Sequence, residues 1–200
     1  MHIISEKGES VMSADQIREL DKKLAFNSAP ALLGIKCASL LSLGTEWFEV
    51  SEYAVRFNKR LESRGLKLRL LCECRSRVLV FVYNERLLKA RLADKRVAAL
   101  LSHCGYDEAM SLEEHLDRLS CRIKAGGDFP HEIGVFLGYP IDDVLGFIEN
   151  GGENYKLCGC WKVYSDTEGA VRAFRSYERC REHLCSKLNK GLDIYQALGI

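Results

Sequence analysis

The stretch from residue 66 to residue 83 constrains the fold more than any other part of this sequence. Two apolar runs, Leu66–Cys74 and Val78–Tyr83, flank a short polar connection, Arg75–Arg77. Such runs around a polar turn predict a β-hairpin. The second run is apolar on both faces, which places it in the centre of a sheet that is covered on both sides. In the first run, regular alternation puts four side chains on one face: Leu68, Leu70, Cys72 and Cys74.

Helical patterns surround this hairpin. Three serines begin capping boxes, each with Gln or Glu three residues later: Ser13, Ser111 and Ser165. Apolar spacing predicts helices over residues 14–26, 51–64, 84–92, 97–104, 112–123 and 165–190. A further strand is expected over residues 157–164, with Trp161 on one face and both Lys162 and Tyr164 on the other. The sequence therefore predicts an α+β fold, with a small antiparallel sheet (hairpin 66–83 plus strand 157–164) packed with several helices.

Length and composition predict a single α+β domain over residues 1–200, in which residues 1–27 form a helical N-terminal extension. The chain is 47% hydrophobic and 28% charged, as in ordinary globular proteins. Residues 1–11 have no long apolar run, and no stretch reaches the ~18 apolar residues that a membrane helix needs. We therefore expect a cytoplasmic protein without a membrane partner, whose nine cysteines are thiols.

Charge is distributed unevenly along the chain. Residues 56–96 carry thirteen basic against four acidic side chains, and residues 106–170 carry five basic against thirteen acidic ones. A basic region of this kind can bind an acidic partner or another anion, which would make the protein an interaction module. The alternative is that the two halves face each other or are ordinary solvated surfaces.

Residues 131–149 have the spacing of a helix-turn-helix unit, joined at Gly138-Tyr139-Pro140. A small residue, Gly134, precedes the turn glycine by four positions, and Val144 and Phe147 follow it by six and nine. DNA binding through this pair is disfavoured, because the second helix carries three acids and no base. The spacing is better explained as the packing of two short helices.

His131 and Glu132 are the candidate catalytic residues. They lie at the start of the first helix of this pair, where an imidazole and a carboxylate could transfer protons. A zincin motif would need a second histidine at the position of Val135. The alternative interpretation is structural, with Glu132 placed to interact favourably with the helix dipole.

Four other residues are candidates for binding a ligand: Lys36, Tyr139, Lys162 and Tyr164. Lys36 is the only charged residue between Lys23 and Glu46, inside an otherwise apolar run. A lysine in such surroundings either extends its amine to the surface or serves an anionic ligand. We expect Lys36, His131 and the Lys162/Tyr164 face to line one pocket.

The cysteines offer a weaker candidate site. Two Cys-x-Cys pairs lie on predicted strands: Cys72 with Cys74, and Cys158 with Cys160. Four thiolates could bind a metal if the third strand lay beside the hairpin. The alternative is that these cysteines are small buried hydrophobic residues. There is no Cys-x-x-Cys motif, so the sequence does not predict a standard structural zinc site.

The chain resembles an uncharacterised bacterial family, a domain of unknown function, in an extended signature. The resemblance rests on three runs: Ala29-Pro30 through Gly34-Ile35-Lys36, His131-Glu132-Ile133-Gly134 through Gly138-Tyr139-Pro140 to Gly146-Phe147-Ile148, and Gly159-x-Trp161-Lys162-Val163-Tyr164. It implies a cytosolic protein of about 200 residues, common in anaerobes, with no catalytic assignments. It also points towards metal, haem or redox biology. Cys37 stands where relatives carry proline, which argues against a shared ligand there.

These observations favour a cytoplasmic protein that binds a small ligand or a metal- or haem-linked cofactor. One alternative is an enzyme that uses His131 and Glu132 in acid–base chemistry. Another is an interaction module whose basic region, residues 56–96, binds an acidic partner. The identity of a cofactor and the substrate of any reaction are left open by the sequence.

Overall fold

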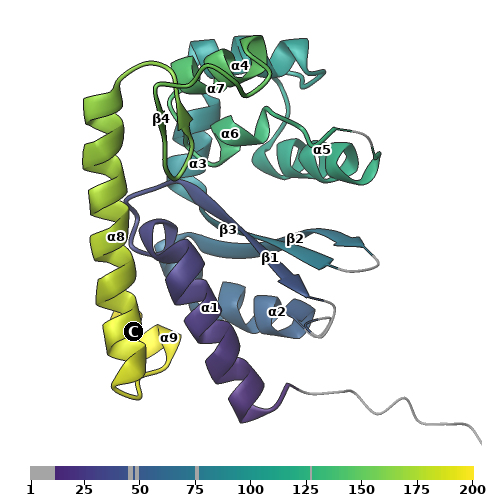
Figure 1. Ribbon diagram of the computed structural model, residues 1–200. Helices are drawn as coiled ribbons and strands as arrows, with labels where there is room; N and C mark the ends of the chain where they lie inside the picture. The colour runs from purple at the N-terminus through teal and green to yellow at the C-terminus, as the bar shows by residue number, and fades with distance from the viewer. Residues whose placement is uncertain (1–11, 45–46, 48–49, 75–76, 127) are drawn as a thin grey trace, which may run out of the picture.

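A three-stranded antiparallel sheet lies at the centre of the computed structural model, which describes residues 12–44, 47, 50–74, 77–126 and 128–200 (Figure 1). Its strand order is β1-β3-β2, with β1 at Ala38–Gly44, β2 at Leu66–Cys74 and β3 at Arg77–Asn84. The α+β class and the hairpin are confirmed. β3 lies between β1 and β2, the central position that its two apolar faces predicted. Its side chains contribute to a core on each side of the sheet.

The third strand of this sheet differs from the prediction. β1 pairs with β3 along its whole length, from Ala38 opposite Tyr83 to Gly44 opposite Arg77. Residues 157–164 instead form a separate two-stranded sheet, β4 (Leu157–Cys158) and β5 (Lys162–Val163). The difference follows from burial, because β1 places Leu41 and Leu43 in the core, whereas the later segment is interrupted by bends at 159–161.

The alternation predicted for β2 holds only as far as Leu70. The register shifts between Leu70 and Cys72, so Leu71 is an extra residue in β2. Leu71 packs into the core on the side of the sheet opposite Leu68. Cys72 lies opposite Leu79, which packs against that second core, so Cys72 does not share a face with Leu68. The side chain of Cys74 lies outside the described part of the structure.

One face of the sheet is covered by helices from the two ends of the chain (Figure 1). These elements are α1 (Ala14–Leu32), α2 (Val50–Arg60) with the 3-10 turn Glu62–Arg64, α8 (Thr167–Asn189) and α9 (Ile194–Leu198). Their apolar residues form the first core, with Leu20, Leu24, Phe57 and Leu184 fully buried. The N-terminal half of α8 continues past this core to the β4–β5 sheet, where Ala170 and Phe174 pack on Trp161.

Helix α1 continues beyond its predicted end at Phe26 and includes Pro30. A proline inside a helix leaves the carbonyl four residues earlier without its N–H partner. Here that carbonyl belongs to Phe26, and the Nε of Arg181 on α8 donates to it at 3.0 Å. A contact from a distant helix thus satisfies the group that Pro30 cannot, which local sequence signals do not reveal.

The opposite face of the sheet carries the remaining helices (Figure 1). They are α3 (Glu85–Leu92), α4 (Lys95–His103), α5 (Leu112–Lys124), α6 (Ile133–Phe136) and α7 (Ile141–Glu149). Their buried residues form a second core with Phe81 and Leu71 of the sheet. Within the described ranges, no helix combines the length and apolar character that crossing a membrane requires.

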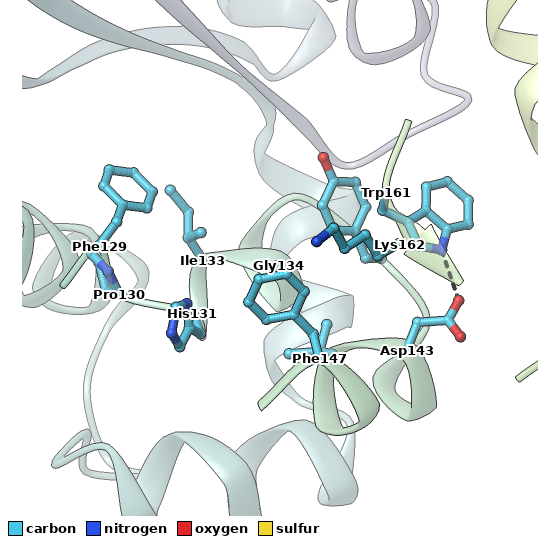
Figure 2. A pocket seen from close by; sticks show the side chains of 11 residues that line it. Phe129, Pro130, His131, Ile133, Gly134, Asp143, Phe147, Trp161 and Lys162 are labelled. Atoms are coloured by element: carbon cyan, nitrogen blue, oxygen red, sulfur yellow. Dashed lines mark hydrogen bonds between the residues drawn. The ribbon is translucent and has the colours of Figure 1, made fainter. Parts of the chain in front are cut away.

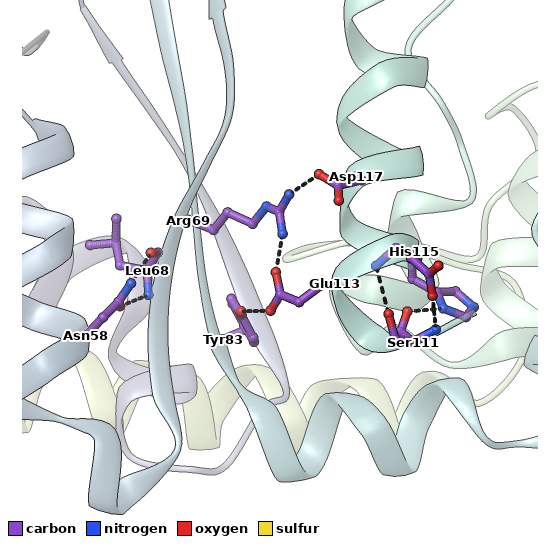
Figure 3. A network of polar contacts seen from close by, with 9 residues as sticks. Asn58, Leu68, Arg69, Tyr83, Ser111, Glu113, His115 and Asp117 are labelled. Atoms are coloured by element: carbon purple, nitrogen blue, oxygen red, sulfur yellow. Dashed lines mark hydrogen bonds and ion pairs between the residues drawn. The ribbon is translucent and has the colours of Figure 1, made fainter. Parts of the chain in front are cut away.

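Part of the charge asymmetry is explained by contacts between the basic and acidic regions. Arg69 of β2 forms ion pairs with Glu113 and Asp117 of α5 (Figure 3). Arg96 of α4 pairs with Asp142 of α7. Other basic side chains of residues 56–96 are exposed, including Arg56 and Lys59 on α2.

The outer edge of β2 is partly covered by Asn58. Its side-chain amide hydrogen-bonds both the backbone N–H and the carbonyl of Leu68, two groups that no neighbouring strand pairs within the described residues (Figure 3).

The capping predictions are confirmed at two of three positions. Ser13 and Ser111 form reciprocal capping boxes with Gln16 and Glu114. The third is wrong by one residue, because Asp166 caps α8 and accepts from the N–H of Gly169. Ser165 is occupied elsewhere, since its backbone N–H and hydroxyl both donate to Asp143.

Candidate functional site

The helix pair α6–α7 forms through close packing between a glycine and a valine. A Cβ atom placed on Gly134 would lie 2.8 Å from Cγ2 of Val144, which is closer than real side chains approach. The second helix begins after Pro140, as its fixed φ favours. The spacing that resembles a DNA-binding unit therefore serves packing, and Arg96 engages the acidic first turn of α7 through Asp142.

Asp143 in the first turn of α7 connects the helix pair to the β4–β5 sheet. Its carboxylate accepts four hydrogen bonds: from Trp161 Nε1 at 2.7 Å, from the backbone N–H groups of Tyr164 and Ser165 at 2.8 Å, and from the Ser165 hydroxyl at 2.7 Å. The side chain is buried, with 2% exposure. Burial acts to raise the pKa of this carboxyl, but the four hydrogen bonds outweigh it and hold the pKa below its usual value.

An apolar cavity of about 310 Å³ lies between this helix pair and the β4–β5 sheet (Figure 2). Its walls come from the segment before α6, from both helices and from β5. Most of the lining is aromatic or aliphatic, and the polar lining residues are His131, Tyr139, Asp143 and Lys162. We call this space the apolar cavity; it is lined by Phe129, Pro130, His131, Ile133, Gly134, Tyr139, Asp143, Val144, Phe147, Trp161 and Lys162.

Trp161 forms one wall of the apolar cavity and is held on several sides. Its ring stacks on Tyr139 with centroids 5.2 Å apart and meets the edge of Phe174 at 4.6 Å. Together with the hydrogen bond to Asp143, these contacts fix its position and leave it 8% exposed. Burial raises the pKa of Tyr139 to about 12, so its phenol is neutral near pH 7. The wall is therefore preformed and uncharged.

The predicted catalytic residues His131 and Glu132 face different environments. His131 is exposed at the rim of the apolar cavity and meets the ring of Phe147 edge-on, with centroids 5.1 Å apart. Glu132 is 2% exposed and forms an ion pair with Arg122, and the Tyr106 hydroxyl donates to it at 3.3 Å. Glu132 is not part of the cavity lining, so the two residues do not form an acid–base pair there.

Two of the four predicted ligand-binding residues, Tyr139 and Lys162, line the apolar cavity together with His131. Lys36 lies behind that wall, with its Nζ 4.9 Å from the Tyr139 ring and 5.6 Å from the Tyr177 ring. Burial lowers the pKa of Lys36, and the neighbouring thiols of Cys37 and Cys160 oppose this effect. Lys36 is therefore adjacent to the cavity without lining it.

Tyr164 also lies outside the cavity lining, although it was predicted to share a face with Lys162. Its side chain packs against Gly146 of α7, where a Cβ would lie 2.6 Å from Tyr164 Cβ. Trp161 and Lys162 both line the cavity, although alternation was predicted to separate them. The two-residue strand β5 and the preceding bends are too short to impose alternation over residues 158–164.

The cysteine pairs belong to two different sheets. Cys72 and Cys74 are on β2 of the central sheet, while Cys158 is on β4 and Cys160 lies in the bend after it. The premise that the third strand lies beside the hairpin is therefore wrong. Cys72 is buried, and Cys158 and Cys160 are exposed thiols. In the part of the chain that is described, no group of three or more His, Cys, Asp or Glu side chains could hold a metal ion.

Several residues of this site were not among the predicted site residues. Asp143 has the local pattern of a helix-start acid, and its four donors lie 18 to 22 residues away. Phe129 and Phe147 have the pattern of ordinary core residues, yet both line the apolar cavity. Gly152 lies in the turn after α7, and its carbonyl accepts from Lys162 Nζ at 2.6 Å. The sequence signal that points to them is the density of glycine, proline and aromatic residues between positions 128 and 164.

The fold and this site define an α+β protein with an apolar cavity between a helix pair and a small β-hairpin. A family model described as a protein of unknown function (DUF3793) matches residues 24–198, and the chain belongs to this family. A comparison with curated proteins finds no match, and neither does a comparison with solved structures.

Proposed function

We propose that this protein binds a small, largely apolar molecule in the apolar cavity. The observation that carries the proposal is a space of about 310 Å³ with walls of aromatic and aliphatic side chains and few polar groups. This volume lies at the small end of the roughly 300–1,000 Å³ that ligand pockets span. Such a site takes a compact molecule of one or two rings better than a large cofactor.

The rigidity of the walls supports binding. Trp161 is fixed by Asp143, Tyr139 and Phe174, and Gly134 is locked against Val144. A preformed wall does not lose side-chain freedom when a ligand arrives, so more of the contact energy contributes to affinity. The ring of Phe147 in the lining suits aromatic ligands, because offset and edge-on ring contacts add to the effect of area burial.

A neutral two-ring compound, 2-naphthamide, tests this proposal directly. The chain has two tryptophans, Trp161 in the cavity wall and Trp47 in the first core. Titration of ¹⁵N-labelled protein to about 1 mM, the weak end of binding, would shift the indole N–H signal of Trp161. The Trp47 signal should not move and serves as the internal control. Two unmoved indole signals would contradict the proposal.

A pair of histidine variants locates the binding site. His131→Trp places a larger side chain at the exposed rim of the cavity and should weaken 2-naphthamide binding about tenfold or more. His103 is also exposed, but it lies on α4 outside the cavity lining, so His103→Trp should leave binding unchanged. Equal loss in both variants would show that the compound binds elsewhere on the surface.

A further inference from the structure

The two opposite charges in the lining of the apolar cavity, on Asp143 and Lys162, have different partners. Its titratable lining residues are His131, Tyr139, Asp143 and Lys162. Asp143 is the one carboxylate among them, and its oxygens already accept four hydrogen bonds from Trp161, Tyr164 and Ser165. Tyr139 is neutral near pH 7 because burial raises its pKa to about 12. The lining thus presents a lysine ammonium without a free negative group beside it.

Lys162 is held in place without an ion pair. Its Nζ donates to the Gly152 carbonyl at 2.6 Å and lies 4.9 Å from the Tyr155 ring and 5.8 Å from the Phe147 ring. Throughout the described ranges, no carboxylate pairs with this ammonium. An ammonium has three N–H donors, so the bond to Gly152 leaves two for another acceptor.

Gly152 makes this arrangement possible. Its φ of +82° is in the left-handed region that favours glycine. A Cβ at this position would meet the Phe147 ring at 3.1 Å and Lys162 Nζ at 3.5 Å. The turn at residues 150–152 therefore brings a backbone carbonyl against the ammonium and fixes it over Phe147. A fixed donor is a better binding group than a flexible surface lysine, because less side-chain freedom is lost on binding.

His131 supplies a second polar group on the other side of the same ring. Its imidazole contacts the edge of Phe147, while Lys162 approaches the ring from β5, and Figure 2 shows the two side chains on opposite sides of Phe147. The ring of Phe147 thus separates two nitrogen-bearing side chains at the border of an apolar space. A flat ligand lying along Phe147 would place a polar substituent within reach of Lys162 at one end of the ring.

We infer that the natural ligand of the apolar cavity is a small aromatic carboxylate, whose anionic group is bound by Lys162. This inference rests on the proposed function and names the class of ligand. A carboxylate suits a site with two free ammonium donors, because charge-assisted hydrogen bonds are shorter and stronger than neutral ones. A phosphate dianion would call for more donors than the lining provides.

Two compounds of equal shape separate this inference from the proposed function. 2-Naphthoate carries the carboxylate, and 2-naphthamide replaces it with a neutral amide of the same size. We expect 2-naphthoate to bind about tenfold more tightly by calorimetry at pH 7, which corresponds to ~1.4 kcal/mol. Binding of both compounds with equal affinity would overturn the carboxylate inference and leave the proposed function intact. Binding of neither would contradict both.

Lysine variants assign the effect to one side chain. Lys162→Met keeps the length of the side chain and removes its charge, and should cancel the preference for 2-naphthoate while preserving 2-naphthamide binding. Lys162→Arg keeps the charge and should retain part of the preference. Lys156 lies on the same hairpin outside the cavity lining, so Lys156→Met is the matched control. A preference that survives in Lys162→Met would overturn the inference, and retained 2-naphthamide binding shows that the variant is folded.

Discussion

Trp161 donates a hydrogen bond from its Nε1 to the buried carboxylate of Asp143 at 2.7 Å. This contact joins the β4–β5 hairpin to α7 and fixes the wall of the apolar cavity (Figure 2). The other donors to Asp143 are two backbone N–H groups and the hydroxyl of Ser165. An indole N–H and a backbone N–H can only donate, so the side chain at position 143 must accept hydrogen bonds through both of its terminal atoms.

Asp143→Asn should therefore destabilise the protein. One oxygen of the asparagine can still accept from Tyr164 and Ser165, but its NH₂ then faces the N–H of Trp161, donor against donor. Leaving a buried polar group unsatisfied costs about 1–3 kcal/mol. Urea denaturation at pH 7 would measure the loss, and the Trp161 indole signal would report the changed wall. A variant as stable as the wild type would refute this account of Asp143.

The pH dependence of this effect has a definite sign. The pKa of Asp143 is lowered in the folded protein, where four hydrogen bonds overcome the effect of burial. The stability it contributes is therefore present above the unfolded value of 3.8 and is lost as the pH falls through the folded pKa. The gap in unfolding free energy between wild type and Asp143→Asn should be largest near pH 7 and narrow below pH 3.8. A gap that widens with acid would contradict the assignment.

Asp21 predicts the opposite outcome for the same substitution. This buried residue of α1 accepts from the Tyr53 hydroxyl at 2.6 Å and from the backbone N–H of Ile194 at 3.0 Å. A hydroxyl can accept as well as donate, so Asp21→Asn can keep both bonds. Burial raises the pKa of Asp21, more than the two hydrogen bonds lower it. The folded state thus disfavours the ionised form.

The stability contributed by Asp21 is present below its unfolded pKa and is lost as the pH rises through the folded value. Asp21→Asn cannot ionise, so it should gain on the wild type between about pH 4 and pH 7, where one pKa unit corresponds to about 1.4 kcal/mol. Urea titrations across this range give the difference directly. A difference that stays constant with pH would show that Asp21 titrates alike in the folded and unfolded chain.

The sequence predicts those parts of the fold that depend on neighbouring residues. The six apolar residues of Val78–Tyr83 suffice to place β3 at the centre of the sheet, and Ser111 with Glu114 suffices to start α5. The extension of α1 past Pro30 depends instead on Arg181, which is 155 residues away from the carbonyl it satisfies. The bulge at Leu71 likewise depends on pairing with β3.

The candidate site shows the same contrast between features set by neighbouring residues and features set by distant contacts. His131 was predicted as a catalytic residue, and Tyr139 and Lys162 as ligand-binding residues; all three line one cavity. Glu132 follows His131 in the sequence but is buried against Arg122 and Tyr106, because successive residues of a turn project in different directions. Asp143 was only one of the three acids counted in the second helix, since its partners come from a hairpin that the sequence does not place beside α7.

The contact between α6 and α7 can be tested by enlarging the side chain at position 134 and reducing the one at position 144. Gly134→Ala should destabilise the protein by about 1–3 kcal/mol, because the new methyl group would overlap Val144. Val144→Ala alone removes buried atoms and leaves a cavity. In the double variant the added methyl group occupies vacated space, so the combined loss should be smaller than the sum of the two. Strictly additive losses in urea denaturation would show that these residues do not touch.

Glu132 provides the last test, because its ion pair with Arg122 is asymmetric. Glu132 is 2% exposed, while the side chain of Arg122 is 36% exposed. Removing Arg122 therefore leaves a buried unpaired charge, whereas removing Glu132 leaves an unpaired charge that water can reach. Arg122→Met strands a buried carboxylate with only the Tyr106 hydroxyl, which should cost about 3 kcal/mol or more. Glu132→Gln leaves an arginine that reaches water and should cost about 1–2 kcal/mol.

Adding Glu132→Gln to Arg122→Met should therefore restore stability, since it removes the stranded charge. The matched control is Arg172→Met, because Arg172 pairs with Glu168 in an exposed contact that contributes little. Urea denaturation of the four variants at pH 7 gives the order. If Arg122→Met is no less stable than Arg172→Met, then the burial of Glu132 does not depend on this ion pair.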